Sequence, residues 1–154
     1  MIDLSGMVVE VQQHFDAPPD VVFALLHDVE RMAGIGPEHE AARWERPDLF
    51  WGRNRLGDFS WEVPCYVVVD DAPHAFGWTV GRTPEQSSTW HYQLRPDGAG
   101  TLVTQRFQHG PGHSYLRQHC EEHPDRAERA IARRADNLRT NMTSVLAGAA
   151  ELLT

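Results

Sequence analysis

The sequence predicts an α+β fold in which an antiparallel β-sheet is covered by one long C-terminal helix. From Ala41 to His109 the chain has the pattern of successive antiparallel strands. From about Pro124 to Leu153, apolar residues recur at spacings of three and four, which is typical of an amphipathic helix. A sheet with one apolar face has to be covered. We therefore expect the helix to lie across the sheet, with a pocket between them if the sheet curves.

A strand and a helical region precede this unit. Residues Met7 to Phe15 place apolar side chains on one face, with a period of two. Pro19 and Asp20 suit the first turn of a helix, where proline is tolerated and a carboxylate is favourable. The apolar stripe of this helix consists of Val22, Leu25, Leu26 and Val29. Gly34, Gly36 and Pro37 end the region.

The strand region contains six segments divided by turn residues. The expected strands are Ala41–Trp44, Phe50–Asn54, Phe59–Asp70, Ala75–Val80, Trp90–Leu94 and a last one that contains Val103 and Phe107. Pro64 interrupts the longest strand and favours an edge position or a bulge there. Pro96-Asp97-Gly98 predicts a tight turn before the last strand.

The C-terminal helix has one predicted buried face. Its members are Ile131, Ala135, Leu138, Met142, Val145, Ala149 and Leu152. Such a stripe could also form a coiled-coil seam, but the sheet in the same chain is the nearer partner.

Size and charge limit the classes of function. The 154 residues suit one domain, residues 1–154, and 41% hydrophobic residues suffice for a core. A net charge of −8 argues against nucleic acid and against docking on an anionic membrane. No apolar run approaches the roughly 20 residues of a transmembrane helix. Two cysteines form no disulfide framework, so we expect a soluble cytoplasmic protein, monomeric or homodimeric.

Three local patterns resemble a known superfamily. They are 15–23 (FDAPPDVVF), 52–63 (GRNRLGDFSWEV) and 90–104 (WHYQLRPDGAGTLVT). In this order they resemble the START-like superfamily, specifically its polyketide cyclase/dehydrase and lipid-transport (SRPBCC) branch. The resemblance implies a helix-grip fold: a curved antiparallel sheet of about seven strands wrapped around the long C-terminal helix, with two short helices after the first strand. It also implies a hydrophobic cavity, but members of the superfamily differ in activity, so it does not fix a function.

Large aromatic side chains on the predicted strands suit the wall of such a cavity. We expect the cavity to be lined by Trp44, Phe50, Asn54, Trp61, Trp78, Trp90, Tyr92, Gln105, Phe107, Leu138 and Met142. The ligand would be a small hydrophobic or aromatic molecule.

Catalytic signals are weak. Tyr66, Arg53 and Arg106 could act as hydrogen-bond donors in a cyclisation, although alternation places Arg106 on the outer face together with His91. No catalytic triad and no pair of carboxylates emerges.

Residues 119–123 match the sequence pattern of a class of zinc proteases. His119, Glu122 and His123 have the spacing H-x-x-E-H. Pro124 follows at once, and the segment lies in a variable connection of the family, so we interpret it as a solvated loop. We expect no metal and no cofactor.

The sequence leaves three functions open. The first is binding of a small apolar molecule, which requires an apolar cavity. The second is a polyketide cyclase/dehydrase-like enzyme, which requires a titratable group on the cavity wall with a perturbed pKa. The third is a protein-interaction module, which would have a filled cavity and an exposed apolar patch.

Overall fold

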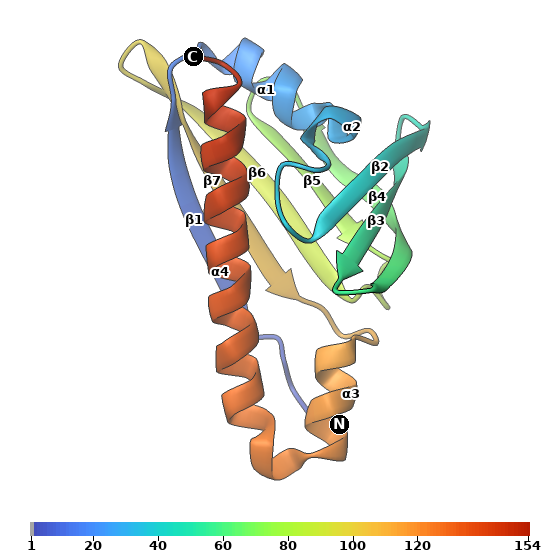
Figure 1. Ribbon diagram of the computed structural model, residues 1–154. Helices are drawn as coiled ribbons and strands as arrows, with labels where there is room; N and C mark the ends of the chain where they lie inside the picture. The colour runs from blue at the N-terminus through green and yellow to red at the C-terminus, as the bar shows by residue number, and fades with distance from the viewer. Residues whose placement is uncertain (1) are drawn as a thin grey trace.

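The computed structural model describes residues 2–154 as one curved sheet with helices along its concave side (Figure 1). The elements in chain order are β1 (Val8–Phe15), α1 (Pro19–His27), α2 (Val29–Met32), β2 (His39–Arg46), β3 (Leu49–Leu56), β4 (Phe59–Asp71), β5 (Ala75–Val80), β6 (Ser88–Asp97), β7 (Gly100–His109), α3 (Tyr115–Glu122), a 3₁₀ turn (Pro124–Arg126) and α4 (Ala127–Glu151). The helix-grip fold predicted from the sequence is confirmed, including the two short helices after the first strand.

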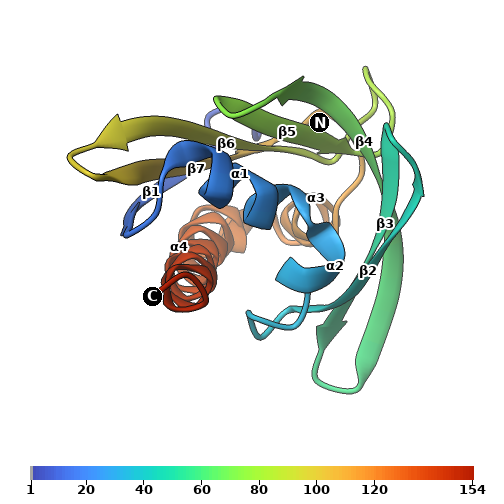
Figure 2. The same cartoon turned by 90° about the horizontal axis from the view of Figure 1, so that it is seen from above.

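The sheet has seven strands in the order β1-β7-β6-β5-β4-β3-β2, and all pairs are antiparallel. Figure 2 shows the sheet bending between β5 and β3, with α2 and α4 inside the bend. The register of β4 against β5 shifts between Val67 and Val69. Such an irregularity strengthens the local twist and helps the sheet to turn.

Pro64 lies where β4 gains its second partner strand. Pairing with β5 begins at the next residue, Cys65, and the Pro64 carbonyl accepts a hydrogen bond from the Gly81 N–H. The N and O atoms of one strand residue point to the same side, so the missing N–H of Pro64 faces the end of β5. The proline therefore removes no hydrogen bond from the β3–β4 ladder.

Helix α4 buries most of its predicted stripe. The buried residues of α4 are Ala127, Leu138, Met142, Val145, Leu146, Ala149 and Ala150. Ile131 and Ala135 are only partly buried. Leu152 was predicted on the buried face, but it follows the end of α4 and is 46% exposed.

The segment before α4 is a helix rather than the solvated loop that the sequence suggested. Helix α3 begins after Ser114, whose Oγ accepts a hydrogen bond from the backbone N–H of Arg117 at 3.0 Å. This serine is therefore an N-cap. Cys120 is buried, on the side of α3 that packs near α4. The apolar residues of α3 are too few to predict a helix from the sequence, but they are sufficient to anchor α3 against α4.

No helix among residues 2–154 is long and apolar enough to span a bilayer.

Candidate functional site: a cavity between the sheet and helix α4

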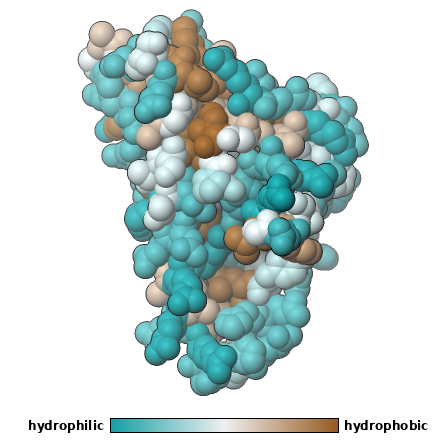
Figure 3. All heavy atoms as spheres, viewed as in Figure 1, coloured by the Kyte–Doolittle hydropathy of each residue, from teal (hydrophilic) through white to brown (hydrophobic). Residues whose placement is uncertain are grey.

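A cavity of about 730 Å³ lies between the concave face of the sheet, the α2–β2 connection and α4. This volume is within the range of small-molecule sites in proteins. On the surface, hydrophobic side chains appear in the hollow between α4 and the β3–β4 hairpin, surrounded by hydrophilic ones (Figure 3).

The structure brings ten of the predicted lining residues to this cavity. They are Phe50, Asn54, Trp61, Trp78, Trp90, Tyr92, Gln105, Phe107, Leu138 and Met142. Trp44 is not at the cavity wall. Its ring stacks on His27 at 5.3 Å and meets Phe50 edge-on at 5.2 Å, because the last turn of α1 covers this part of β2.

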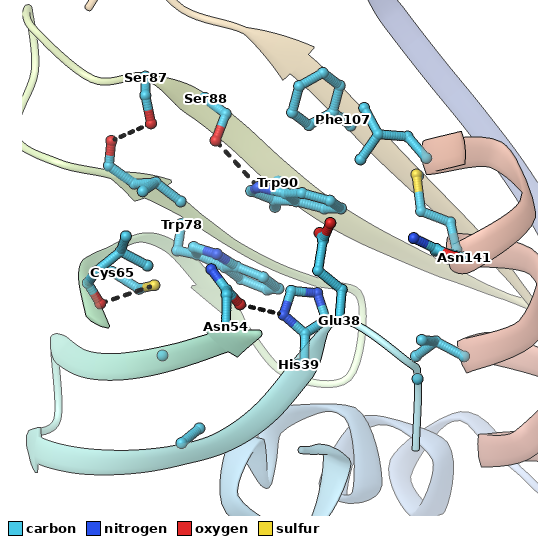
Figure 4. A pocket seen from close by; sticks show the side chains of 18 of the residues that line it. Glu38, His39, Asn54, Cys65, Trp78, Ser87, Ser88, Trp90, Phe107 and Asn141 are labelled. Atoms are coloured by element: carbon cyan, nitrogen blue, oxygen red, sulfur yellow. Dashed lines mark hydrogen bonds between the residues drawn. The ribbon is translucent and has the colours of Figure 1, made fainter. Parts of the chain in front are cut away.

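Aromatic rings make one wall of the cavity. The rings of Trp78 and Trp90 are nearly parallel, at 10° and 6.4 Å between centroids, and Phe107 meets Trp90 at 5.0 Å. The indole N–H of Trp90 donates to Ser88 Oγ at 3.1 Å, which fixes its orientation (Figure 4). Flat rings held in this way provide a preformed surface for a flat or elongated ligand.

Polar groups lie on the opposite side, where β2 begins. Arg134 of α4 forms a bidentate pair with Glu38, at 3.0 and 3.2 Å. The Nδ1–H of His39 donates to Asn54 Oδ1 at 2.8 Å, so Nε2 is the unprotonated nitrogen of the neutral ring. Figure 4 shows Glu38, His39 and Asn54 facing Trp78 and Trp90.

A second polar pair, Tyr92 and Gln105, lies on the sheet itself. The two residues are directly opposite each other on β6 and β7, and both line the cavity. Burial raises the pKa of the Tyr92 hydroxyl well above its usual range, so this group is a hydrogen-bond donor and not a base. The Oε1 atom of Gln105 is buried and has no hydrogen-bond partner among residues 2–154.

A third group joins His109, at the end of β7, to Ser114. A carbonyl can only accept, so Nδ1–H of His109 donates to Gly110 O at 2.7 Å, and Nε2 accepts from Ser114 Oγ, also at 2.7 Å. Burial lowers the pKa of His109, which favours the neutral ring. Arg117 fixes the same turn through its bonds to the carbonyls of Gly110 and Gly112.

The other donors considered for catalysis lie away from the cavity. Arg53 binds Glu40 at 2.9 Å, and the guanidinium of Arg82 lies 4.7 Å over the ring of Tyr66. Arg106 and His91 are on the outer face of the sheet, as alternation along their strands predicts.

Cys65 and the histidine motif show no reactive arrangement. Burial raises the pKa of the Cys65 thiol to about 12, so this side chain behaves as a small hydrophobic group. The ring of His119, on α3, is 5.0 Å from that of His123, the residue that follows α3. Within residues 2–154, no three His, Cys, Asp or Glu side chains form a group that could hold a metal ion.

Sequence reasoning missed Glu38, His39, His109, Ser114 and Arg134. The alternation along β7 that places Gln105 and Phe107 at the cavity also extends to His109, so this residue could have been found. Glu38 and Arg134 are 96 residues apart, and no local pattern predicts that they meet.

The fold is that of a helix-grip, START-like protein. The sequence profile of the polyketide cyclase/dehydrase and lipid transport family matches residues 7–143. The chain belongs to this family.

Solved structures support the same fold. The Polyketide_cyc-like protein Cgl2372 from Corynebacterium glutamicum is 24% identical, with 96% of this chain and 91% of that chain covered and a TM-score of 0.69. The protein TTHA0849 from Thermus thermophilus is 16% identical, with 94% of each chain covered and a TM-score of 0.65. The di-domain ARO/CYC StfQ from the steffimycin biosynthetic pathway is 14% identical, with 96% of this chain and 50% of that chain covered and a TM-score of 0.69. Among curated protein sequences, none matches the chain.

Proposed function

We propose that the chain acts as one domain that binds a small, largely apolar molecule with a flat or aromatic body in the cavity between the sheet and α4. The observation that carries this proposal is the open volume of about 730 Å³ beside the ordered rings of Trp78 and Trp90. A cavity of this size leaves its lining atoms with fewer protein packing contacts, and a bound ligand would supply the missing contacts.

Native mass spectrometry of the purified protein, followed by organic extraction, tests this function. We expect a co-purified apolar molecule. In a second measurement, 2-naphthol should quench the tryptophan fluorescence with one-to-one saturation. The quenching should weaken in Trp90→Phe, at the cavity, and persist in Trp51→Phe, whose indole donates to Glu45 on the outer face. If nothing co-purifies and no probe saturates, the cavity is not a binding site.

A cyclase/dehydrase-like enzyme is the second candidate, and the arrangement of His39 favours it. Asn54 holds the Nδ1–H of this histidine, so Nε2 can accept a proton from a bound keto compound at the cavity wall. A poly-keto thioester incubated with the protein should then lose water, which mass spectrometry detects as a loss of 18 Da. Turnover that His39→Gln leaves unchanged would contradict this role.

A protein-interaction module would require a filled cavity, so the open volume argues against this function.

A further inference from the structure

The cavity contains one buried polar atom whose hydrogen-bonding capacity is unmet. Gln105 is 4% exposed, and its Oε1 lacks a partner within residues 2–154. Burying an amide oxygen without a partner costs free energy, and most such atoms in proteins are paired. On β1, the residue opposite Gln105 is Val11, which offers no polar side chain.

The neighbour on the other side is Tyr92. Its ring lies 5.8 Å from that of Trp78, so its body belongs to the aromatic wall. Residues directly opposite in an antiparallel pair have Cβ atoms about 4.5–5.5 Å apart. The side chains of Tyr92 and Gln105 therefore leave the sheet side by side, and both lie on an otherwise apolar surface of the cavity.

The chemistry of these two side chains selects one kind of ligand group. A hydroxyl can donate to the amide oxygen of Gln105 and accept from the hydroxyl of Tyr92. A ketone or an ether only accepts, so it leaves the Gln105 oxygen unpaired. A hydrocarbon leaves both groups unpaired.

We propose that Gln105 and Tyr92 form a hydroxyl-recognition subsite, and that the ligand is a flat, apolar molecule with a phenolic or alcoholic hydroxyl at the end that meets the sheet. This inference rests on the proposed binding function and narrows its ligand class. It predicts that the cavity distinguishes ligands with a hydroxyl from ligands without one by a hydrogen bond, while its other contacts to the ligand are apolar.

The test compares 2-naphthol with 2-methylnaphthalene by isothermal titration calorimetry. The two probes have the same shape, and the methyl group is the more hydrophobic. A cavity without the subsite would therefore prefer 2-methylnaphthalene. We expect the wild-type protein to prefer 2-naphthol by about tenfold or more. Gln105→Met and Tyr92→Phe should each lose most of this preference.

A matched control is Gln93→Met, one residue beyond Tyr92 on the outer face of β6, which should keep the wild-type preference. Thermal melting of every variant establishes that it is folded. The wild-type protein could bind both probes with equal affinity, or bind 2-methylnaphthalene more tightly. Either result would contradict the proposed subsite but would still support binding in the cavity. A preference that persists in Gln105→Met also overturns the subsite. If neither probe binds, the proposed binding function itself fails.

Discussion

The two ring nitrogens of His109 have different hydrogen-bond partners, and these partners determine which protonation state of the ring the folded protein favours. Nδ1–H donates to a backbone carbonyl, and Nε2 accepts from the Ser114 hydroxyl that caps α3. Protonation would place a second N–H against that hydroxyl and a charge in a buried position beside Arg117. The folded state therefore favours the neutral ring.

This arrangement predicts that the contribution of His109 to protein stability is lost when the pH is lowered through the histidine range. Burial depresses the folded-state pKa of His109, so its stabilising contribution is present above the unfolded-state value of about 6.5 and is lost as the pH falls toward the lower folded-state pKa. Urea unfolding at pH 7.5 and at pH 5.5 measures the change in the free energy of unfolding. In His109→Gln the decrease between these two pH values should be smaller than in the wild-type protein.

His14 provides a control of opposite sign. Its hydrogen bond to Asp97, at 2.9 Å, and the bond to Asp16 raise its pKa. Its contribution is therefore present below about pH 6.5 and is lost as the pH rises through the raised value. Acid should destabilise His14→Gln more steeply than the wild-type protein. An equal pH dependence in all three proteins would contradict both assignments.

The pair Glu38–Arg134 connects two parts of the fold that are distant in the chain, the residue before β2 and the N-terminal half of α4. The Glu38 side chain is only 12% exposed and that of Arg134 is 36% exposed, so the pair is partly shielded from water. The α2–β2 connection also packs closely on α4, because a Cβ atom on Gly36 would collide with Cγ2 of Val145. These contacts hold one side of the cavity closed.

Removing the pair should accelerate ligand exchange. A partly buried ion pair contributes about 1 kcal/mol, a value between those of exposed and buried pairs, and this corresponds to a rate factor of about fivefold. We expect 2-naphthol to dissociate from Arg134→Met about fivefold faster than from the wild-type protein in stopped-flow fluorescence. Arg133→Met is the matched control, because Arg133 is exposed on the same helix and should leave the rate unchanged. Equal dissociation rates in the two variants would mean that the ion pair does not restrain the opening of the cavity.

The elements that sequence reasoning predicted well are those whose pattern is local. Alternation along β6 and β7 places Trp90, Tyr92, Gln105 and Phe107 on one face, and the sheet keeps that face inward. Trp44 alternates in the same way, yet α1 covers it, and the position of α1 follows from tertiary packing. Helix α3 has few apolar residues, and its start depends on the cap at Ser114. The pairing of Glu38 with Arg134 requires the whole fold, so no strand or helix pattern could reveal it.

At the scale of the whole molecule, packing is dense at one end and open at the other. Phe15, Val22, Leu26, Phe76 and Val103 are at most 1% exposed, where α1 and the C-terminal half of α4 cover the sheet. Beside the middle of α4, the same sheet borders a cavity of about 730 Å³. Large unfilled volumes reduce stability because the lining atoms lose packing partners. The dense end therefore holds the fold while the open end remains available for a ligand.

This division predicts that a cavity ligand stabilises the whole molecule and not only its site. A ligand that binds only the folded state adds about 2.7 kcal/mol when its free concentration is 100 times Kd. For a domain of this size, that stabilisation should raise the Tm by roughly 5–10 °C. Differential scanning calorimetry with and without 2-naphthol measures the shift. Trp78→Leu, which opens the aromatic wall, should show a smaller shift at the same 2-naphthol concentration because its affinity is lower. Trp51→Leu, on the outer face, should show the wild-type shift. If Trp78→Leu also kept the full shift, 2-naphthol would stabilise the protein from a site outside the cavity.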